Sequence, residues 1–285
     1  MPPRRTLRAV SAPYFPVEER PLQMVASLAR FGTDFGHEGD ARFFQVDDDR
    51  DAYVAAKREA PPERWFVAGE DEAARGARQE AYGWMLDTLE AEHPGLLGAA
   101  AREPEQGLHQ LALLVQEDFA VLHAGDDDAG RCVALDVRFP SGWRPERLRD
   151  ASFEAIHGPV PDFPTSAAAA RGMVRAMVDR GPYVRFVWTL TPDDALDQHP
   201  DVRDRRAGWA AGGPGVFRVE RQVTVPLPRT RSSVFLIRVY RTPLDALAPW
   251  QQRQLIEALR VMPDEVRRYK SLPTADALAT LLDAA

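Results

Sequence analysis

The sequence has almost no cysteine: among its 285 residues, only Cys132 carries a thiol. One thiol cannot form a disulfide within the chain, and it cannot by itself supply an iron–sulfur cluster or a structural zinc site made of thiolates. If the protein takes part in electron transfer, we therefore expect any such cluster to belong to another chain.

Long apolar runs and an excess of positive charge are also missing. No stretch is long enough to span a membrane, and no apolar run follows the basic residues Met1–Arg8, so no signal peptide is expected. The formal net charge is −7. Because nucleic-acid binding needs a concentrated basic face, this balance disfavours a nucleic-acid partner. The expected location is the cytoplasm.

The remaining composition is that of an ordinary folded protein, with 45% hydrophobic and 28% charged residues. A chain of this length can form one large domain with extensions. Residues 1–71 mix Pro, Arg and Asp with scattered aromatic residues, which favours an irregular N-terminal extension with short helices. We expect the main domain over residues 72–245 and a C-terminal helical extension, packed on it, over residues 246–285.

Apolar residues recur at helical spacing in several segments. Between Glu72 and Glu92 they recur every four residues and so share one face, at Ala77, Ala81, Met85 and Leu89. A second helix is expected over Glu105–Asp118, and a third should begin at a cap formed by Thr165 or Ser166 and end near Asp179. Helices at the C-terminus are expected to begin at Pro249, Pro263 and Ala275.

Five segments have the composition of β-strands: Phe119–His123, Arg131–Val137, Tyr183–Leu190, Val216–Leu227 and Val234–Tyr240. The first two flank a turn rich in Gly and Asp, which predicts a hairpin. Residues 191–215 should form a long surface loop, either a lid or an insertion. About five strands joined by hairpins, with helices at both ends, favour an antiparallel sheet of the α+β class.

Six short motifs occur together in the order typical of one known family: Val115–Phe119, Phe139–Pro145, Ile156–Pro161, Phe217–Gln222, Ile237–Tyr240 and Pro263–Lys270. Over about residues 40 to 272, the chain resembles the family of the alpha subunit of haem-dependent oxidative N-demethylase. The resemblance implies a PAS-like domain that binds haem b. It also implies a monooxygenase-type reaction that demethylates a small secondary amine with O2, using electrons from a partner protein that carries flavin and an iron–sulfur centre.

The chain departs from the family pattern at three places. It has Val187-Trp188 where the family usually has Asn-Trp, Asp162 where the proline motif usually ends in Gly, and Arg231-Ser232 in place of Ser-Gly. Losing a polar Asn near the pocket would change what the pocket can bind, so the substrate could differ from dimethylamine. Two alternatives stay open: a haem-based gas or ligand sensor without turnover, and a relative that has lost haem.

His157 is the candidate iron ligand, because an imidazole nitrogen is a standard axial ligand of haem. Gly158 would let a flat macrocycle approach the backbone, and Pro159 and Pro161 would stiffen the loop that directs the ring. We expect His157 to bind the iron and Pro159 to lie beside the haem. A loop or core histidine is the alternative.

The other histidines lie among polar or turn residues, without a partner at metal-ligand spacing, and should be at the surface: His37, His93, His109, His123 and His199. Cys132 lies in an apolar run, where a thiol is usually a small core residue; a thiolate ligand of haem is the alternative.

The strand Val216–Leu227 places polar residues on both of its faces. Arg221 falls on the apolar face, while Arg218, Glu220 and Gln222 alternate to the other face. Arg221 either pairs with a buried carboxylate or projects over the haem, where it could polarise O2 or hold a propionate. If the strand twists or bulges, Glu220 faces the pocket instead and accepts a hydrogen bond from an amine.

Three further residues of the strands are candidates for the site. Tyr240 could donate a proton or contact a propionate, although a strand tyrosine is more often a packing residue. Arg238 shares its face and is a candidate for contact with the cofactor. Trp188 is either a wall of the haem pocket or part of the core.

Overall fold

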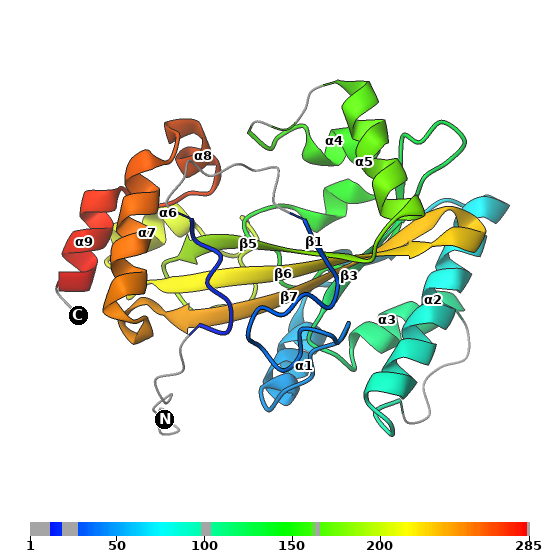
Figure 1. Cartoon of the computed structure of the whole chain (residues 1–285), viewed down its shortest axis with the longest axis horizontal. Coiled ribbons are helices and arrows are strands. Elements are labelled where there is room, and N and C mark those ends of the chain that lie inside the picture. Colours follow the sequence, from blue (N-terminus) through cyan, green and yellow to red (C-terminus); the bar gives the residue numbers. More distant parts are fainter. Residues whose placement is uncertain (1–11, 19–27, 98–103, 162, 164–165, 284–285) are drawn as a thin grey trace.

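An antiparallel sheet of seven strands forms the centre of the described part of the chain (Figure 1). The computed structural model describes residues 12–18, 28–97, 104–161, 163 and 166–283. The basic segment Met1–Arg8, the departure Asp162 and the alternative cap Thr165 lie outside these residues.

The strand order is β1-β5-β6-β7-β3-β4-β2. The strands are β1 Ala29–Arg30, β2 Trp65–Val67, β3 Asp118–His123, β4 Arg131–Asp136, β5 Tyr183–Thr191, β6 Val216–Leu227 and β7 Ser232–Pro243. All five predicted strands are present, and β3 and β4 form the expected hairpin. The expected number of strands was too low, because β1 and β2, at the two edges of the sheet, are too short to produce a recognisable alternation. The α+β class is confirmed.

Nine α-helices surround the sheet in the described residues: α1 Arg50–Glu59, α2 Glu72–Glu92, α3 Pro104–Ala112, α4 Phe153–His157, α5 Ala167–Asp179, α6 Arg205–Ala210, α7 Pro249–Val261, α8 Asp264–Tyr269 and α9 Ala275–Asp283. Short 3-10 helices include η1 Pro62–Arg64 and η2 Pro145–Leu148. None of the helices in the described part of the chain has the length and apolar composition needed to cross a membrane.

Each face of the sheet has its own cover of helices. Figure 1 shows α4 and α5 on one side, which we call the α5 face, and α1, α2 and α3 on the other, the α2 face. Successive strand residues alternate between the faces, so Leu122 packs with Val174 of α5 while Val121 joins the core beneath α2. Helices α7 and α9 cover the end of the α2 face at Trp188, Phe217 and Tyr240.

The predicted helix Glu72–Glu92 has the expected bounds, and all four residues of its apolar stripe are fully buried. The Asp71 carboxylate accepts a hydrogen bond from the Ala74 N–H and so caps this helix. The second predicted helix was too long: α3 ends at Ala112, and the side chains of Gln116 and Glu117 then accept hydrogen bonds from the backbone N–H groups of Asp47 and Gln45.

The C-terminal helices agree with the prediction, with α7 beginning at Pro249 and α9 at Ala275, while Pro263 precedes α8. The expected long loop over residues 191–215 is interrupted by α6. The Asp204 carboxylate caps α6 by accepting hydrogen bonds from the N–H groups of Arg206 and Ala207. This cap was not recognised in the sequence, because the surrounding Asp, Arg, Gly and Pro residues are typical of a loop.

Candidate functional site

Strand β6 divides the predicted site residues between the two faces of the sheet. In its register with β5, Glu220 pairs with Val187 and Arg221 pairs with Phe186. Residues paired directly across an antiparallel ladder share a face. Glu220 therefore lies on the α5 face, and Arg221 lies on the α2 face.

His157 is the last residue of α4, on the α5 side of the sheet. The Ser152 hydroxyl caps this helix by accepting a hydrogen bond from the Ala155 N–H. The His157 Nδ1 atom is 2.9 Å from the carbonyl oxygen of Phe153, and because a carbonyl can only accept, Nδ1 must carry the proton. The ring stacks on Phe163, with centroids 4.9 Å apart and planes 19° apart.

This arrangement leaves His157 neutral, with one free nitrogen. Burial lowers the pKa of its imidazole, and the positive charge of Arg185 lowers it further. Nε2 makes no hydrogen bond with any residue that the structure describes. A neutral imidazole with Nδ1 bound to a carbonyl and Nε2 free has the form that metal-binding histidines usually take. Pro159 lies exposed in the turn just after α4.

A chain of hydrogen bonds crosses the α5 face beside this histidine. Arg185 Nε donates to Gln222 Oε1 at 2.6 Å, and Gln222 Nε2 donates to Glu220 Oε2 at 2.7 Å. The Ser141 hydroxyl donates to Glu220 Oε1 and accepts from Arg218 Nε at 2.8 Å. Both oxygens of the Glu220 carboxylate are thereby fixed in orientation by neutral donors.

Two more cations lie near the Glu220 carboxylate. Lys270 Nζ donates to the Trp188 carbonyl at 2.7 Å, and Arg205 Nη2 donates to the Leu190 carbonyl at 2.7 Å. Burial lowers the pKa of Lys270 to about 8, while the charge of Glu220 opposes that shift. Burial also lowers the pKa of Arg205 to about 10. Among the described residues, the charge of Glu220 therefore acts on four cations: Arg185, Arg205, Arg218 and Lys270.

Four predicted site residues lie on the α2 face instead. Arg221 is 1% exposed, and its Nη2 donates to the carbonyls of Asp40 and Arg42 at 3.2 and 2.9 Å. It forms no ion pair with a described carboxylate, so the alternative of a buried Arg–Glu pair is not found among the described residues. Arg238 donates to Asp47 Oδ2 at 2.7 Å, and the Tyr240 hydroxyl donates to Gln45 Oε1. These contacts attach the N-terminal residues to the sheet.

Trp188 also lies on the α2 face. It packs against Phe217, with ring centroids 6.3 Å apart, in the cluster that α7 and α9 cover. The structure therefore brings His157 and Glu220 to one side of the sheet, and places Arg221, Arg238, Tyr240 and Trp188 on the other.

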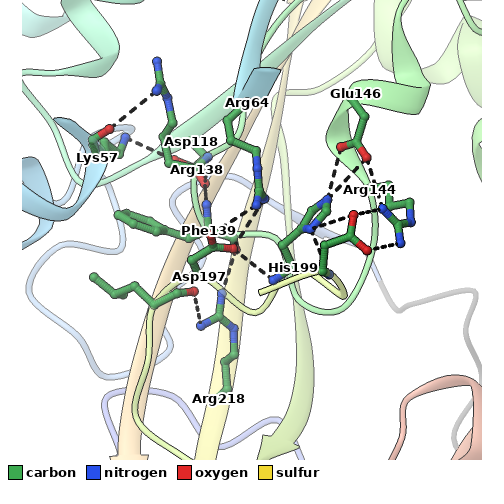
Figure 2. Close-up of polar contacts among 12 residues, drawn as sticks. Lys57, Arg64, Asp118, Arg138, Phe139, Arg144, Glu146, Asp197, His199 and Arg218 are labelled. Atoms are coloured by element: carbon green, nitrogen blue, oxygen red, sulfur yellow. Dashed lines mark hydrogen bonds and ion pairs between the residues drawn. The ribbon is translucent and has the colours of Figure 1, made fainter. Parts of the chain in front are cut away.

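The prediction that His199 is a surface residue was wrong, since its side chain is only 6% exposed. Figure 2 shows the network that holds it: Nε2 lies 3.2 Å from Glu146 Oε2, and Arg144 binds the Asp201 carboxylate with both terminal nitrogens. One ligand atom each from Glu146, His199 and Asp201 lies within 4.8 Å of the others. The Arg144 guanidinium forms ion pairs with both Glu146 and Asp201, so these carboxylates already have a cation and do not require a metal ion.

Figure 2 also shows how this network continues toward the sheet. Arg64 binds Asp197 at 3.2 Å, and Arg218 donates to the carbonyls of Leu196 and Phe139 at 2.9 and 2.7 Å. Lys57 and Asp118 form a buried ion pair at 3.2 Å. Because Arg218 also binds the Ser141 hydroxyl, the loop over residues 193–201 is coupled to the orientation of Glu220.

Cys132 is buried, and burial raises the pKa of its thiol to about 12. A thiol that resists ionisation is a poor ligand for iron, so the structure favours the interpretation as a core residue. A cavity of about 330 Å³ lies elsewhere, and it includes none of the predicted site residues; it is lined by Lys57, Arg58, Ala60, Pro62, Trp65, His109, Leu113 and Arg138.

Sequence reasoning missed Arg185, Ser141 and Lys270. Ser141 and Lys270 stand inside two of the six motifs, and Arg185 occupies an alternate position of a strand that was predicted correctly. In a comparison with known families, the model described as haem-dependent oxidative N-demethylase, alpha subunit-like, matches residues 40–278. The match spans well over half of the chain and includes both His157 and Glu220.

Proposed function

The chain belongs to the haem-dependent oxidative N-demethylase, alpha subunit-like family. From this premise we propose that it is a haem-dependent oxidative enzyme that removes a methyl or other small alkyl group from an amine. The observation that carries the proposal is the state of His157: a neutral imidazole whose Nδ1 donates to the Phe153 carbonyl and whose Nε2 is free. This donor set fits haem iron.

In this proposal His157 would hold the haem iron through Nε2, and the cofactor would be haem b in a PAS-like domain. Haem supplies the redox centre at which O2 is activated and the amine is oxidised. The stacked Phe163 ring and the Phe153 carbonyl fix the direction of the Nε2 lone pair. Pro159 would restrict the backbone next to the ligand.

Glu220 is the residue that we assign to the substrate. An ammonium group at neutral pH is a strong hydrogen-bond donor, and a carboxylate held by Ser141 and Gln222 is an oriented acceptor for it. When the amine loses its N–H proton to this carboxylate, the nitrogen lone pair becomes available for oxidation. Glu220 therefore acts as both binding group and base.

The opposite face takes a structural role in the same proposal. Arg221, Arg238 and Tyr240 bind the N-terminal residues, and Trp188 packs under α7. The electrons come from a separate flavin and iron–sulfur protein, since a single buried thiol cannot hold a cluster. We place the reaction in the cytoplasm, the compartment favoured by the sequence.

Spectroscopy of the purified protein tests the cofactor and the ligand. After reconstitution with haem, the native chain should show a Soret band that is shifted or lost in His157→Gln. The matched control is His123→Gln, which removes a half-buried imidazole that contacts Thr230 and Ser232 on the α2 face of the sheet. An identical Soret band in native protein and His157→Gln would refute the assignment of the ligand.

Oxygen uptake tests the reaction. Dimethylamine and its homologues should perturb the Soret band, and with a reductant they should drive O2 consumption and release of an aldehyde. Glu220→Gln should weaken the amine response while the haem remains bound. If O2 binds stably and no amine raises its consumption, the gas-sensor alternative replaces the enzyme.

A further inference from the structure

Arg185 is half-buried and has fewer partners than the buried arginines near it, Arg205 and Arg218. Among the described residues its guanidinium makes one hydrogen bond, from Nε to the neutral amide oxygen of Gln222. Arg218, by contrast, donates to Ser141 and to two carbonyls, and Arg205 donates to one hydroxyl and two carbonyls. Within the described residues, the terminal nitrogens of Arg185 therefore have no partner and can bind an added group.

The positive charge of Arg185 also lacks a direct counterion. No described carboxylate lies within ion-pair distance, and Glu220 is reached only through Gln222. Burial lowers the pKa of Arg185, and the charge of Glu220 opposes that shift only in part. Arg185 is half-buried, so its guanidinium is only partly solvated, and a bound anion would stabilise its charge.

The position of Arg185 indicates which anion would do so. Arg185 pairs with Gln222 of β6, so its side chain lies on the α5 face. Arg185 is also close enough to His157 for the guanidinium charge to lower the pKa of that imidazole. A haem bound through iron at His157 carries propionate carboxylates at its edge, and the planar fork of an arginine matches a carboxylate with two parallel hydrogen bonds.

We infer that Arg185 binds a propionate of the haem held by His157; this inference rests on the proposed function. Gln222 then connects the edge of the cofactor with Glu220, the carboxylate assigned to the amine, because the Gln222 amide accepts a hydrogen bond from Arg185 and donates one to Glu220. One amide group thereby links the arginine at the haem edge to the carboxylate that Ser141 also holds.

The test compares haem with its dimethyl ester, in which the propionates are uncharged. The affinity of the apoprotein for each is measured by Soret titration, and the dissociation rate by transfer of haem to excess apomyoglobin. The native chain should bind haem more tightly than the ester by about 10- to 100-fold. Arg185→Gln should reduce this preference by about tenfold, mainly by weakening the binding of haem.

Arg171→Gln is the matched control, since it removes an exposed arginine of α5 without touching this face, and it should leave the preference unchanged. Should Arg185→Gln not fold, Arg185→Lys takes its place, because it keeps the charge but loses the fork; the preference should then fall by about threefold.

The outcomes separate the two claims. If the native chain binds neither compound, both the proposed function and the role of Arg185 fail. If it binds haem through His157 but Arg185→Gln keeps the full preference for haem over its ester, the proposed function stands and the role of Arg185 is refuted. The role of Arg185 in binding the propionate would also be refuted if Arg185→Gln changed the rate at which the oxygen-bound protein oxidises but kept the preference for haem over its ester. The guanidinium would then act on O2.

Discussion

Glu220 and Arg221 are neighbours in β6, yet their side chains project to opposite faces of the sheet. Glu220 pairs with Val187 and is bound by Ser141 and Gln222, whereas Arg221 binds the carbonyls of Asp40 and Arg42 beneath the sheet. Exchanging either residue should therefore affect a different property of the protein.

Arg221→Met should lower the free energy of unfolding by about 1–3 kcal/mol, because the carbonyls of Asp40 and Arg42 lose their donor in a buried place. Urea denaturation measures this change. The haem spectrum and its response to amines should stay as in the native protein, while Glu220→Gln should show the reverse pattern. A lost amine response in Arg221→Met at native stability would contradict this division.

Lys270 should make stability depend on pH in the alkaline range. Its pKa in the folded chain is lowered from 10.5 to about 8, so the unfolded chain binds more protons between these values. The free energy of unfolding should therefore rise with pH from 8 to 10.5, by at most about 3 kcal/mol for this group.

The comparison variant for this effect is Lys270→Met, which lacks the titrating amine. The difference in unfolding free energy between native and variant protein, measured in urea at several pH values, cancels the tyrosines that also titrate there. A difference that is constant from pH 8 to 10.5 would show that Lys270 stays charged in the fold.

Two helical glycines should respond oppositely to alanine. A Cβ on Gly83 in α2 would meet nothing within 4 Å, whereas one on Gly107 in α3 would lie 2.3 Å from a ring carbon of Tyr82. Gly83→Ala should raise the free energy of unfolding by up to about 1 kcal/mol through helix propensity. Gly107→Ala should lower it by about 1–3 kcal/mol, because the Tyr82 ring must move. Equal effects of the two changes in thermal or urea unfolding would contradict this packing.

The sequence predicted the helices and strands of this fold better than it predicted which face of the sheet carries the candidate site. The bounds of α2 and the five main strands follow from local periodicity, and alternation placed Arg221 with the apolar residues of β6 correctly. Alternation could not tell which face would meet a cofactor, because both faces are covered and nearly every residue of β6 is buried. The sequence therefore gives no reason to prefer the polar face with Glu220 over the face with Arg221.

Partners that are distant in the sequence could not be predicted either. The carbonyls that bind Arg221 belong to Asp40 and Arg42, in a segment without regular structure, and no local pattern connects them with β6. His199 is buried because η2 brings Glu146 over it, which is again a contact between remote segments. The role of Ser141 depends on the same long-range packing, although its motif marked the position.

Val187 offers the most direct test of substrate choice. It pairs with Glu220 across β5 and β6 and is half-buried on the same face, so an alkyl group on an amine held by Glu220 would meet an apolar side chain there. The family pattern that the chain resembles implies an Asn at this position, whose polar amide would hydrogen-bond where Val187 offers an apolar side chain. We expect the native chain to favour amines with larger alkyl groups, such as diethylamine over dimethylamine.

Val187→Asn should shift this preference toward dimethylamine by about fivefold to tenfold, in line with the discrimination that one methylene usually gives. The measurement is the ratio of amine dissociation constants from Soret titration. Val187→Ala is the control, because it removes apolar contact without adding an amide: it should weaken binding of the larger amine and leave that of dimethylamine nearly unchanged. If all three proteins give the same ratio, Val187 does not contact the alkyl group, and the amine lies on another side of Glu220.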